Sequence, residues 1–166
     1  MDFKHFFSGK GVLMQKPKAY MGIDPGQTGA AALISNDGID CFDWPGDASA
    51  FAGEIRQWCD DYDIAICILE KVGAMPKQGV SSMFKFGRNA GMIEGVLAAL
   101  NIPYDLQRPQ QWQRGLIYKD DGTDNKSRAL AAARRLYPNV DFLRRKKDHG
   151  RAEALLMAHV AFREGK

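Results

Sequence analysis

Several features are scarce or missing in this sequence. No apolar run reaches the length of a membrane span, because Lys, Arg, Asp or Glu interrupts every hydrophobic stretch. The first ten residues lack the long apolar region and the small-residue cleavage site of a secretory signal, so we expect none. No internal repeat or low-complexity stretch occurs, so nothing indicates a repeat architecture.

Cysteine is also scarce. The three cysteines, Cys41, Cys59 and Cys67, are too few and too scattered for a disulfide framework or a zinc site. Cys67 lies inside an apolar segment and is expected to be a small buried hydrophobe. A reducing, cytoplasmic location fits this usage best, and we expect no membrane partner.

The composition is that of a globular domain. The chain has 166 residues, of which 45% are hydrophobic and 26% charged, enough for one domain with a substantial core. We expect residues 1–17 to be a flexible N-terminal lead-in and residues 18–166 to be the domain. The net charge of +3 is small, but a basic stretch, Arg144, Arg145, Lys146 and Lys147, precedes the last acidic pair. Such a stretch suits an enzyme acting on a polyanion, although a solvated basic turn before a helix is equally compatible.

The pattern of apolar residues and turns predicts a mixed α/β fold. Three strands separated by short turns open the chain and form an antiparallel meander. Alternating helices and strands follow, which gives a five-stranded sheet flanked by helices. The expected strands are residues 18–23, 30–34, 39–44, 64–69 and 102–106, and the expected helices are residues 48–60 (capped by Asp47), 82–100 (capped by Ser81 or Ser82), 109–112, 126–137 and 149–164.

Carboxylates stand at the ends of these apolar segments. Asp24 ends the first strand, Glu70 ends the fourth, and Asp148 and Glu153 bracket the start of the last helix. A carboxylate at the tip of a hydrophobic strand is costly unless it faces a solvated, functional edge of the sheet. Since a crossover connection returns the chain beside its start, Asp24 and Glu70 are expected to be neighbours. The pattern indicates a hard-cation site of oxygen ligands, suited to two Mg²⁺ or Mn²⁺ ions acting on a phosphodiester.

Five segments stand in order along the chain: residues 22–29 (GIDPGQTG), 69–72 (LEKV), 78–88 (QGVSSMFKFGR), 109–112 (PQQW) and 147–156 (KDHGRAEALL). Together they resemble the RuvC family of Holliday junction resolvases, within the RNase H-like superfamily, and most closely its phage and prophage members. The Asp-Pro-Gly strand alone is also found in sugar kinases and actin-like folds, but all five segments in register are specific. They span Tyr20 to Phe162.

The resemblance implies a homodimeric, magnesium-dependent endonuclease that cuts four-way or branched DNA by paired symmetric nicks, through a two-metal-ion mechanism. Asp24 matches the first-strand aspartate of the family and Glu70 its central glutamate. Glu153 matches the acidic residue of the final helix. Mn²⁺ is expected to substitute for Mg²⁺.

The sequence departs from the family at the fourth acidic position. The familiar spacing places Asp or His three residues before the last acid, where this chain has Gly150. His149 and Glu153, four residues apart, share a helix face. We favour Asp148 as the metal ligand because Mg²⁺ prefers oxygen, although a plain N-cap role is the alternative. His149 would then contact metal-bound water or phosphate, or act as a general base.

Other residues are candidates for contacts with DNA and with a second subunit. Lys126 opens a helix, where its amine and the helix N-terminus could meet one phosphate. The other DNA-contact candidates are Lys77, Arg88, Arg151 and the basic stretch at 144–147. Small residues at four-residue spacing, Gly87, Gly91 and Gly95, mark a helix face for the dimer contact.

Two alternatives to junction resolution remain open. An RNase H-type nuclease acting on RNA–DNA hybrids would have the same metal site, although the segment at 78–88 disfavours it. A non-catalytic protein that binds branched DNA would keep the basic surface, but it would not need the four acids. A nucleotide-binding kinase-like domain needs a second similar half, for which this chain is too short.

Overall fold

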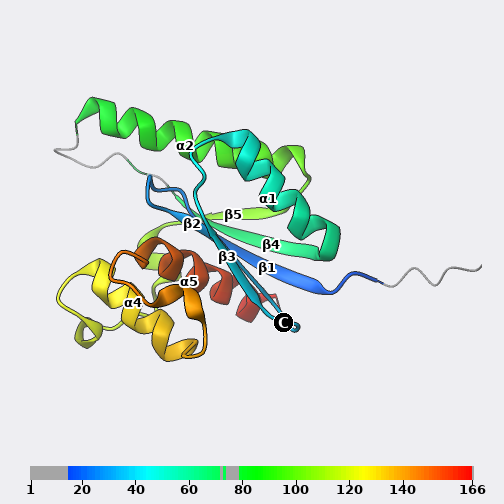
Figure 1. Cartoon of the computed structure of the whole chain (residues 1–166). Helices are drawn as coiled ribbons and strands as arrows, with labels where there is room; N and C mark the ends of the chain where they lie inside the picture. Colours follow the sequence, from blue (N-terminus) through cyan, green and yellow to red (C-terminus); the bar gives the residue numbers. More distant parts are fainter. Residues whose placement is uncertain (1–14, 72, 74–78, 166) are drawn as a thin grey trace, which may run out of the picture.

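A five-stranded sheet with helices on both faces runs through the protein (Figure 1). The computed structural model describes residues 15–71, 73 and 79–165. No helix in these ranges is long and apolar enough to cross a membrane. The strands are β1 (Lys18–Asp24), β2 (Ala30–Ser35), β3 (Ile39–Asp43), β4 (Asp63–Glu70) and β5 (Tyr104–Gln107). The helices are α1 (Ala48–Asp61), α2 (Val80–Ala99), α3 (Pro109–Trp112), α4 (Asn125–Leu136) and α5 (His149–Glu164), with short 3₁₀ helices η1 (Lys119–Asp121) and η2 (Asp141–Leu143).

The strand order confirms the predicted topology. The order across the sheet is β3-β2-β1-β4-β5, with β1, β2 and β3 antiparallel and β4 and β5 parallel to β1. Helix α1 makes the crossover that returns β4 to the side of β1. Because Ile23 pairs with Leu69, the next residues along, Asp24 and Glu70, end their strands side by side at one edge.

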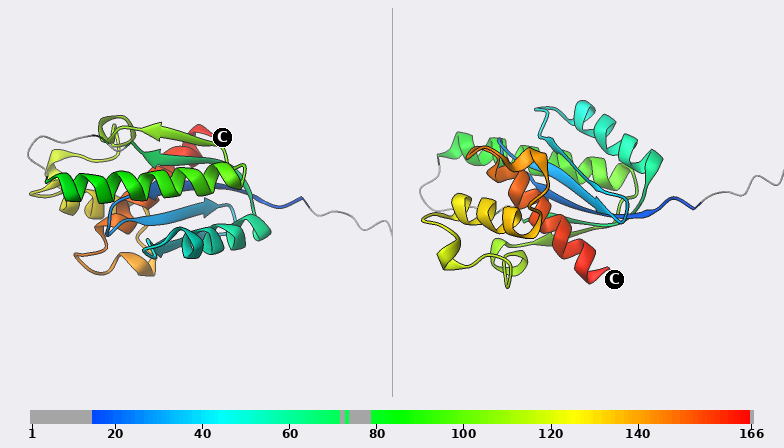
Figure 2. Two further views of the ribbon diagram at one scale, coloured as in Figure 1. Left: turned by 90° about the horizontal axis from the view of Figure 1, so that it is seen from above. Right: turned by 60° about the horizontal axis from the view of Figure 1, so that its bottom comes forward.

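Each face of the sheet has its own hydrophobic cluster. In β1, Ala19, Met21 and Ile23 point toward α1 and α2, whereas Tyr20 points toward α5, as expected from the alternation of side chains along a strand. Figure 2 shows α1 and α2 together over one face and α4 and α5 together over the other. The sheet is therefore covered on both sides, and its strand ends are the edges left for a site.

Element boundaries differ from the predictions by one or two residues. Asp47 caps α1 as predicted, accepting a hydrogen bond from the Ala50 N–H at 2.9 Å. Helix α2 starts earlier than Ser81 or Ser82, because the Gly79 carbonyl already accepts the N–H groups of Ser82 and Met83. Of the expected lead-in, only residues 15–17 are described.

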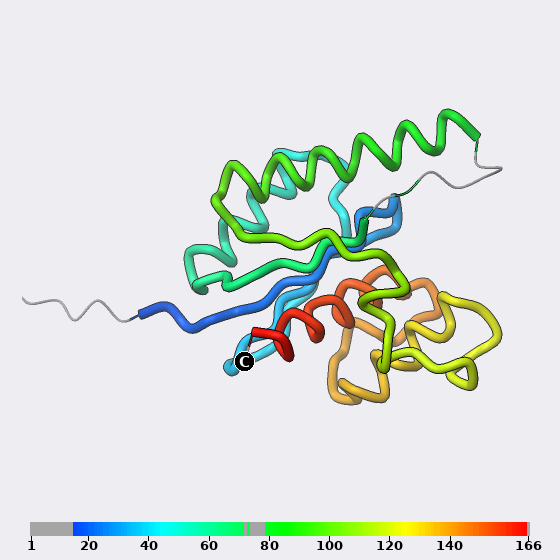
Figure 3. Tube along the Cα trace, turned by 180° about the vertical axis from the view of Figure 1, so that it is seen from behind, coloured from blue at the N-terminus to red at the C-terminus, as the bar shows by residue number. Residues whose placement is uncertain are grey.

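Helix α5 crosses directly over β1, and glycine makes that crossing possible (Figure 3). A Cβ atom added at Gly22 would lie 2.2 Å from the Ala154 carbonyl oxygen and 2.2 Å from the Ala158 nitrogen. Both are backbone atoms in the middle of a helix and cannot move aside independently. The two backbones therefore approach more closely than any side chain at residue 22 permits.

This close approach predicts that Gly22→Ala lowers the free energy of unfolding by about 3 kcal/mol, since the added methyl forces α5 away from the sheet. Gly53→Ala is the matched control, because a Cβ at Gly53 in α1 meets nothing within 4 Å. That change should stabilise the protein by about 0.5–1 kcal/mol through helix propensity. Urea denaturation of both variants checks this, and equal effects of the two substitutions would contradict the packing argument.

Candidate active site

Asp24 is held at the end of β1 by the turn that follows it. Its side chain is buried, and its Oδ1 accepts a hydrogen bond from the Gly26 N–H at 2.9 Å. The turn closes through a hydrogen bond from the Gly29 N–H to the Gly26 carbonyl at 3.0 Å. A Cβ at Gly29 would lie 2.0 Å from the Asp24 carbonyl oxygen, so glycine is required where the turn folds back. The local sequence thus fixes the Asp24 carboxylate near the edge of the sheet.

Two further carboxylates reach the same edge. Glu70 ends β4, and its Oε1 accepts a hydrogen bond from the indole N–H of Trp112 at 3.2 Å. Glu153, in the second turn of α5, lies close enough to Asp24 for the two carboxyl groups to shift each other's pKa. Three elements distant in sequence therefore bring Asp24, Glu70 and Glu153 together, as the positions of these acids in the sequence predicted.

Burial makes the ionised forms of these acids unfavourable. Desolvation raises the pKa of Asp24, against the opposing effects of the Gly26 N–H and the charge of His149. Desolvation, helped by the charge on Asp24, raises the pKa of Glu70 to about 7. The same causes, with Glu70 added, raise the pKa of Glu153 to about 8. Carboxylates that lie close together and out of water bind protons more tightly, and a cation can take the place of those protons.

The structure separates Asp148 from His149. Asp148 is buried, but its carboxylate turns back to Arg145, accepting the Arg145 backbone N–H at 2.7 Å and its Nε–H at 3.0 Å. Burial raises the pKa of Asp148, and the Arg145 hydrogen bonds outweigh this and hold it below its usual value. His149 instead acts electrostatically on Asp24. This arrangement does not support Asp148 as the metal ligand, because its oxygens already bind Arg145.

The glycine at the family's fourth position has a steric cause. A Cβ at Gly150 would lie 2.1 Å from the Thr28 carbonyl oxygen and 3.1 Å from the Gly29 Cα. The first turn of α5 therefore lies against the turn that follows Asp24. No Asp or His fits at residue 150 in this arrangement, so the neighbouring residue has to supply any fourth group.

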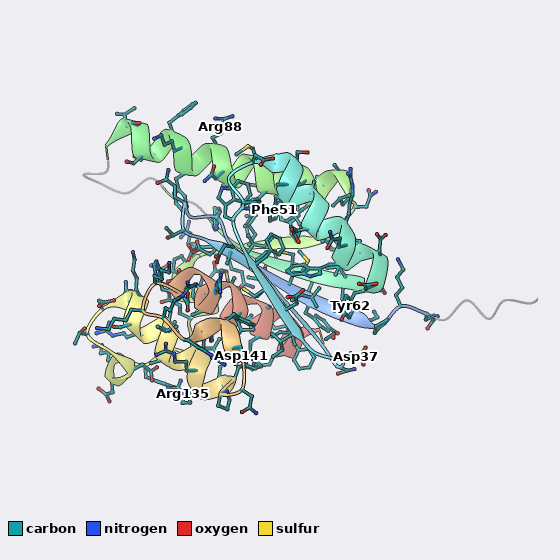
Figure 4. All side chains as sticks on the ribbon, in the orientation of Figure 1. Asp37, Phe51, Tyr62, Arg88, Arg135 and Asp141 are labelled. Atoms are coloured by element: carbon teal, nitrogen blue, oxygen red, sulfur yellow. The ribbon has the colours of Figure 1, made fainter. Side chains whose placement is uncertain are left out.

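The basic candidates fall into three groups. Lys126, exposed at the start of α4, lowers the pKa of Asp24 and of Glu153 through its charge, so it lies near the acidic cluster. Lys146 and Lys147 are exposed just before α5. Arg88 is exposed on α2, across the sheet from α4 and α5 (Figure 4). Lys77 lies outside the described residues.

Three of the predicted DNA-contact arginines already have carboxylate partners. Arg144 pairs with Asp141 and Arg145 with Asp148. Arg151 binds Asp43 in a bidentate manner, with its Nε and Nη2 atoms both 2.6 Å from the carboxylate oxygens. Contacts from Arg145 and Arg151 to DNA would have to compete with these pairs. Among the predicted candidates that the structure describes, Lys126 is the cation shown to act on the acidic cluster.

The donor set fits a hard divalent cation in its chemistry. Asp24, Glu70 and Glu153 supply carboxylate oxygens, the ligands that Mg²⁺ and Mn²⁺ prefer. Within the ranges that the structure describes, no three Asp, Glu, His or Cys side chains already surround a common point as ligands would. Here Asp24 accepts a hydrogen bond from the Gly26 N–H and Glu70 accepts one from Trp112. Binding an ion would turn the carboxylates toward it.

Sequence reasoning missed two partners of the site. Trp112 belongs to a segment recognised as matching the RuvC family, but no role followed from that match. Asp43, at the end of β3, binds Arg151 across 108 residues of sequence. The contact of Trp112 with Glu70 could have been inferred from its position in a short helix directly after β5, because Gln107 of β5 pairs with Glu70. Nothing in the sequence pointed to Asp43.

Solved structures provide the comparison. RuvC from Thermus thermophilus in complex with a Holliday junction substrate aligns with a TM-score of 0.55 and 11% identity, covering 91% of this chain and 96% of that one. Another Thermus thermophilus RuvC structure aligns with a TM-score of 0.48 and 12% identity, over 89% and 95% of the two chains. No protein-family model and no curated protein matches the sequence. At this identity the first alignment shows the fold alone. The chain has the RNase H-like α/β fold that RuvC has.

Proposed function

We propose that this protein is a divalent-metal-dependent endonuclease that resolves four-way or branched DNA. The observation that carries the proposal is the gathering of Asp24, Glu70 and Glu153 at one sheet edge, with their charged forms disfavoured by burial. The same fold occurs in a RuvC structure bound to a Holliday junction substrate, which supports a branched-DNA substrate. Exposed lysines near this edge suit a phosphate backbone.

The three carboxylates are assigned as the ligands of the ions. When bound, Mg²⁺ ions would stabilise the charge that develops on the phosphate and lower the pKa of a bound water. The charge of Asp24 acts on both other carboxylates, so we assign Asp24 as the ligand that would act together with each of them. Asp24, Glu70 and Glu153 would hold the ions. Asp24 is buried and Glu70 and Glu153 are half-buried, which limits the access of competing water to these contacts.

Two basic side chains complete the proposed site. Lys126 stands at the N-terminus of α4, where the helix dipole and its amine both favour a phosphate. His149 shares a helix face with Glu153 and acts on Asp24. We assign it, in place of Asp148, as the fourth group, holding or moving a proton at the attacking water or contacting the ion.

The first test is cleavage by an Asp24→Asn variant. The substitution removes the charge of the shared ligand but keeps its shape, so nicking of a synthetic four-way junction should fall by at least about a thousandfold, or about 4 kcal/mol of transition-state stabilisation. Junction binding in a gel shift should remain or strengthen. Strand-resolved gels with Mg²⁺, Mn²⁺, Ca²⁺ and EDTA measure both. Full activity in EDTA would refute the metal mechanism.

Matched substrates in the same assay separate the alternatives. Linear duplex should stay intact while the junction receives paired symmetric nicks. Preferential cleavage of an RNA–DNA hybrid would instead identify an RNase H-type nuclease. Tight junction binding with no nicking in any metal would identify a non-catalytic DNA-binding protein.

Stability without DNA provides a second test of the ion site. Glu153 has a pKa raised above its unfolded value, so its protonated form is favoured by folding, and this stability is lost as pH rises from about 4.5 toward about 8. Glu153→Gln should therefore raise the free energy of unfolding in EDTA at pH 8 by about 1–2 kcal/mol, or roughly 4 °C in Tm. At pH 4 the difference should nearly vanish.

Mg²⁺ should reverse the order of stability of wild type and Glu153→Gln. Mg²⁺ is expected to raise the Tm of the wild type at pH 8 and to raise that of Glu153→Gln less, because one ligand is lost. Glu54→Gln, on the exposed side of α1, is the control and should behave as wild type. If Mg²⁺ stabilises Glu153→Gln as much as wild type, Glu153 is not a ligand.

We also propose a homodimer formed through α2. Gly87, Gly91 and Gly95 are exposed, and a Cβ at each would meet nothing within 4 Å, so this face does not serve packing within the described part of the chain. The same helix exposes Val80 at 86% and Phe84 at 71%. An apolar, close-packing helix face suits a symmetric contact, and a two-fold particle places two sites on one junction.

Sedimentation equilibrium tests the dimer. The wild type should show twice the chain mass at micromolar concentration, and Gly91→Arg should be a monomer, because the side chain holds two such faces apart. Gly38→Arg, in the turn between β2 and β3, adds the same charge away from α2 and should remain a dimer. A monomeric wild type that still makes paired nicks would contradict the proposal.

A further inference from the structure

Trp112 joins the hydrophobic core to the acidic cluster. Its side chain is only 1% exposed and belongs to the cluster beneath α5. Its indole N–H nevertheless donates to Glu70 Oε1 at 3.2 Å, across 42 residues of sequence. A buried indole needs an acceptor for its one N–H, and here the acceptor is a carboxylate of the candidate site.

The short helix that carries Trp112 is fixed relative to the end of β4. Gln107 of β5 pairs with Glu70, and its carbonyl accepts the Lys71 N–H at 2.8 Å. Two residues later Pro109 starts α3. The Arg108 N–H donates to Gln111 Oε1 at 2.9 Å, which closes the helix start. Backbone pairing therefore ties the indole and the Glu70 carboxylate to one rigid frame.

The hydrogen bond acts on the orientation of Glu70. Glu70 has three side-chain torsions and stands at a strand end, where packing alone restrains it weakly. The Trp112 N–H engages Oε1 and so leaves Oε2 as the oxygen that meets an ion. A neutral donor of this kind orients the carboxylate and leaves its negative charge intact. An arginine in the same place would neutralise that charge.

We propose that Trp112 is a positioning residue for the metal site, holding the Glu70 carboxylate in the orientation in which it binds a divalent cation. The inference rests on the proposed function, because it assumes that Glu70 is a ligand. It assigns to the segment at residues 109–112 a task beyond core packing. Partners that orient a ligand typically change metal affinity by about 10–100-fold when they are removed.

The chain contains a matched control. Trp58 on α1 is 6% exposed and donates its indole N–H to Asp40 at 2.8 Å, on the other side of the sheet from α5. Trp58→Phe and Trp112→Phe therefore each remove one buried indole and one hydrogen bond to a carboxylate. Only the second bond involves a proposed ligand.

Isothermal titration calorimetry with Mn²⁺ on the full chain measures the effect. We expect Trp112→Phe to raise the Kd for Mn²⁺ about tenfold or more, and Trp58→Phe to change it less than about twofold. In the DNA cleavage assay, the Trp112→Phe variant should recover part of its lost cleavage rate at saturating Mn²⁺. Equal Kd values for wild type and Trp112→Phe would overturn the inference. Absence of Mn²⁺ binding by the wild type would instead overturn the proposed function.

Fluorescence tests the same contact without removing the indole. The chain has three tryptophans, so in a Trp44→Phe, Trp58→Phe background Trp112 is the sole reporter. Mg²⁺ should change its emission in a saturable manner at the calorimetric Kd. Adding Glu70→Gln, which keeps the acceptor oxygen but loses the charge, should abolish that change. Unaltered Trp112 emission at saturating Mg²⁺ would overturn the inference, even if Trp112→Phe does not fold.

Discussion

The closeness of α5 to β1 determines where the acidic side chains lie. Gly22 lets the helix backbone cross the strand, and Gly150 lets its first turn rest on the turn after Asp24. Glu153 follows Gly150 by less than one helical turn, so the two contacts set its position relative to Asp24. A methyl group at either glycine would widen this separation. The packing of α5 on the sheet therefore also sets the geometry of the acidic cluster, and a substitution that loosens the helix would displace Glu153 from Asp24.

The same packing brings three carboxylates together out of water, and no arginine among the ion pairs of the described residues neutralises them. Four arginines of the described residues pair with carboxylates outside the acidic cluster: Arg135 with Asp121, Arg144 with Asp141, Arg145 with Asp148 and Arg151 with Asp43. None of these four ion pairs includes Asp24, Glu70 or Glu153. The cluster thus keeps its excess negative charge, which Lys126 offsets only in part. A site built this way is less stable when ionised, so the proposed divalent cation would also be expected to stabilise the folded protein.

The sequence predicted what depends on pattern and chain order. Alternation and turn residues gave the strands, and the crossover placed Asp24 beside Glu70, as the pairing of Ile23 with Leu69 confirms. Boundaries such as the start of α2 at Val80 followed local hydrogen bonds that composition does not determine. The side-chain partners escaped prediction for a different reason. The Trp112–Glu70 and Arg151–Asp43 contacts join residues 42 and 108 positions apart, so they exist only once the sheet and α5 are assembled.

The interpretation of Asp148 shows how local backbone geometry decides between two adjacent residues. An N-cap side chain that serves its helix usually has extended backbone angles and accepts a first-turn N–H. Asp148 has φ −80° and ψ 19° and makes no side-chain cap bond. It binds Arg145 instead, and these hydrogen bonds hold the basic stretch beside the start of α5, where Lys146 and Lys147 are exposed. Because Asp148 binds Arg145 and packing requires glycine at residue 150, His149 is the residue of the three whose side chain is left to act on the acidic cluster.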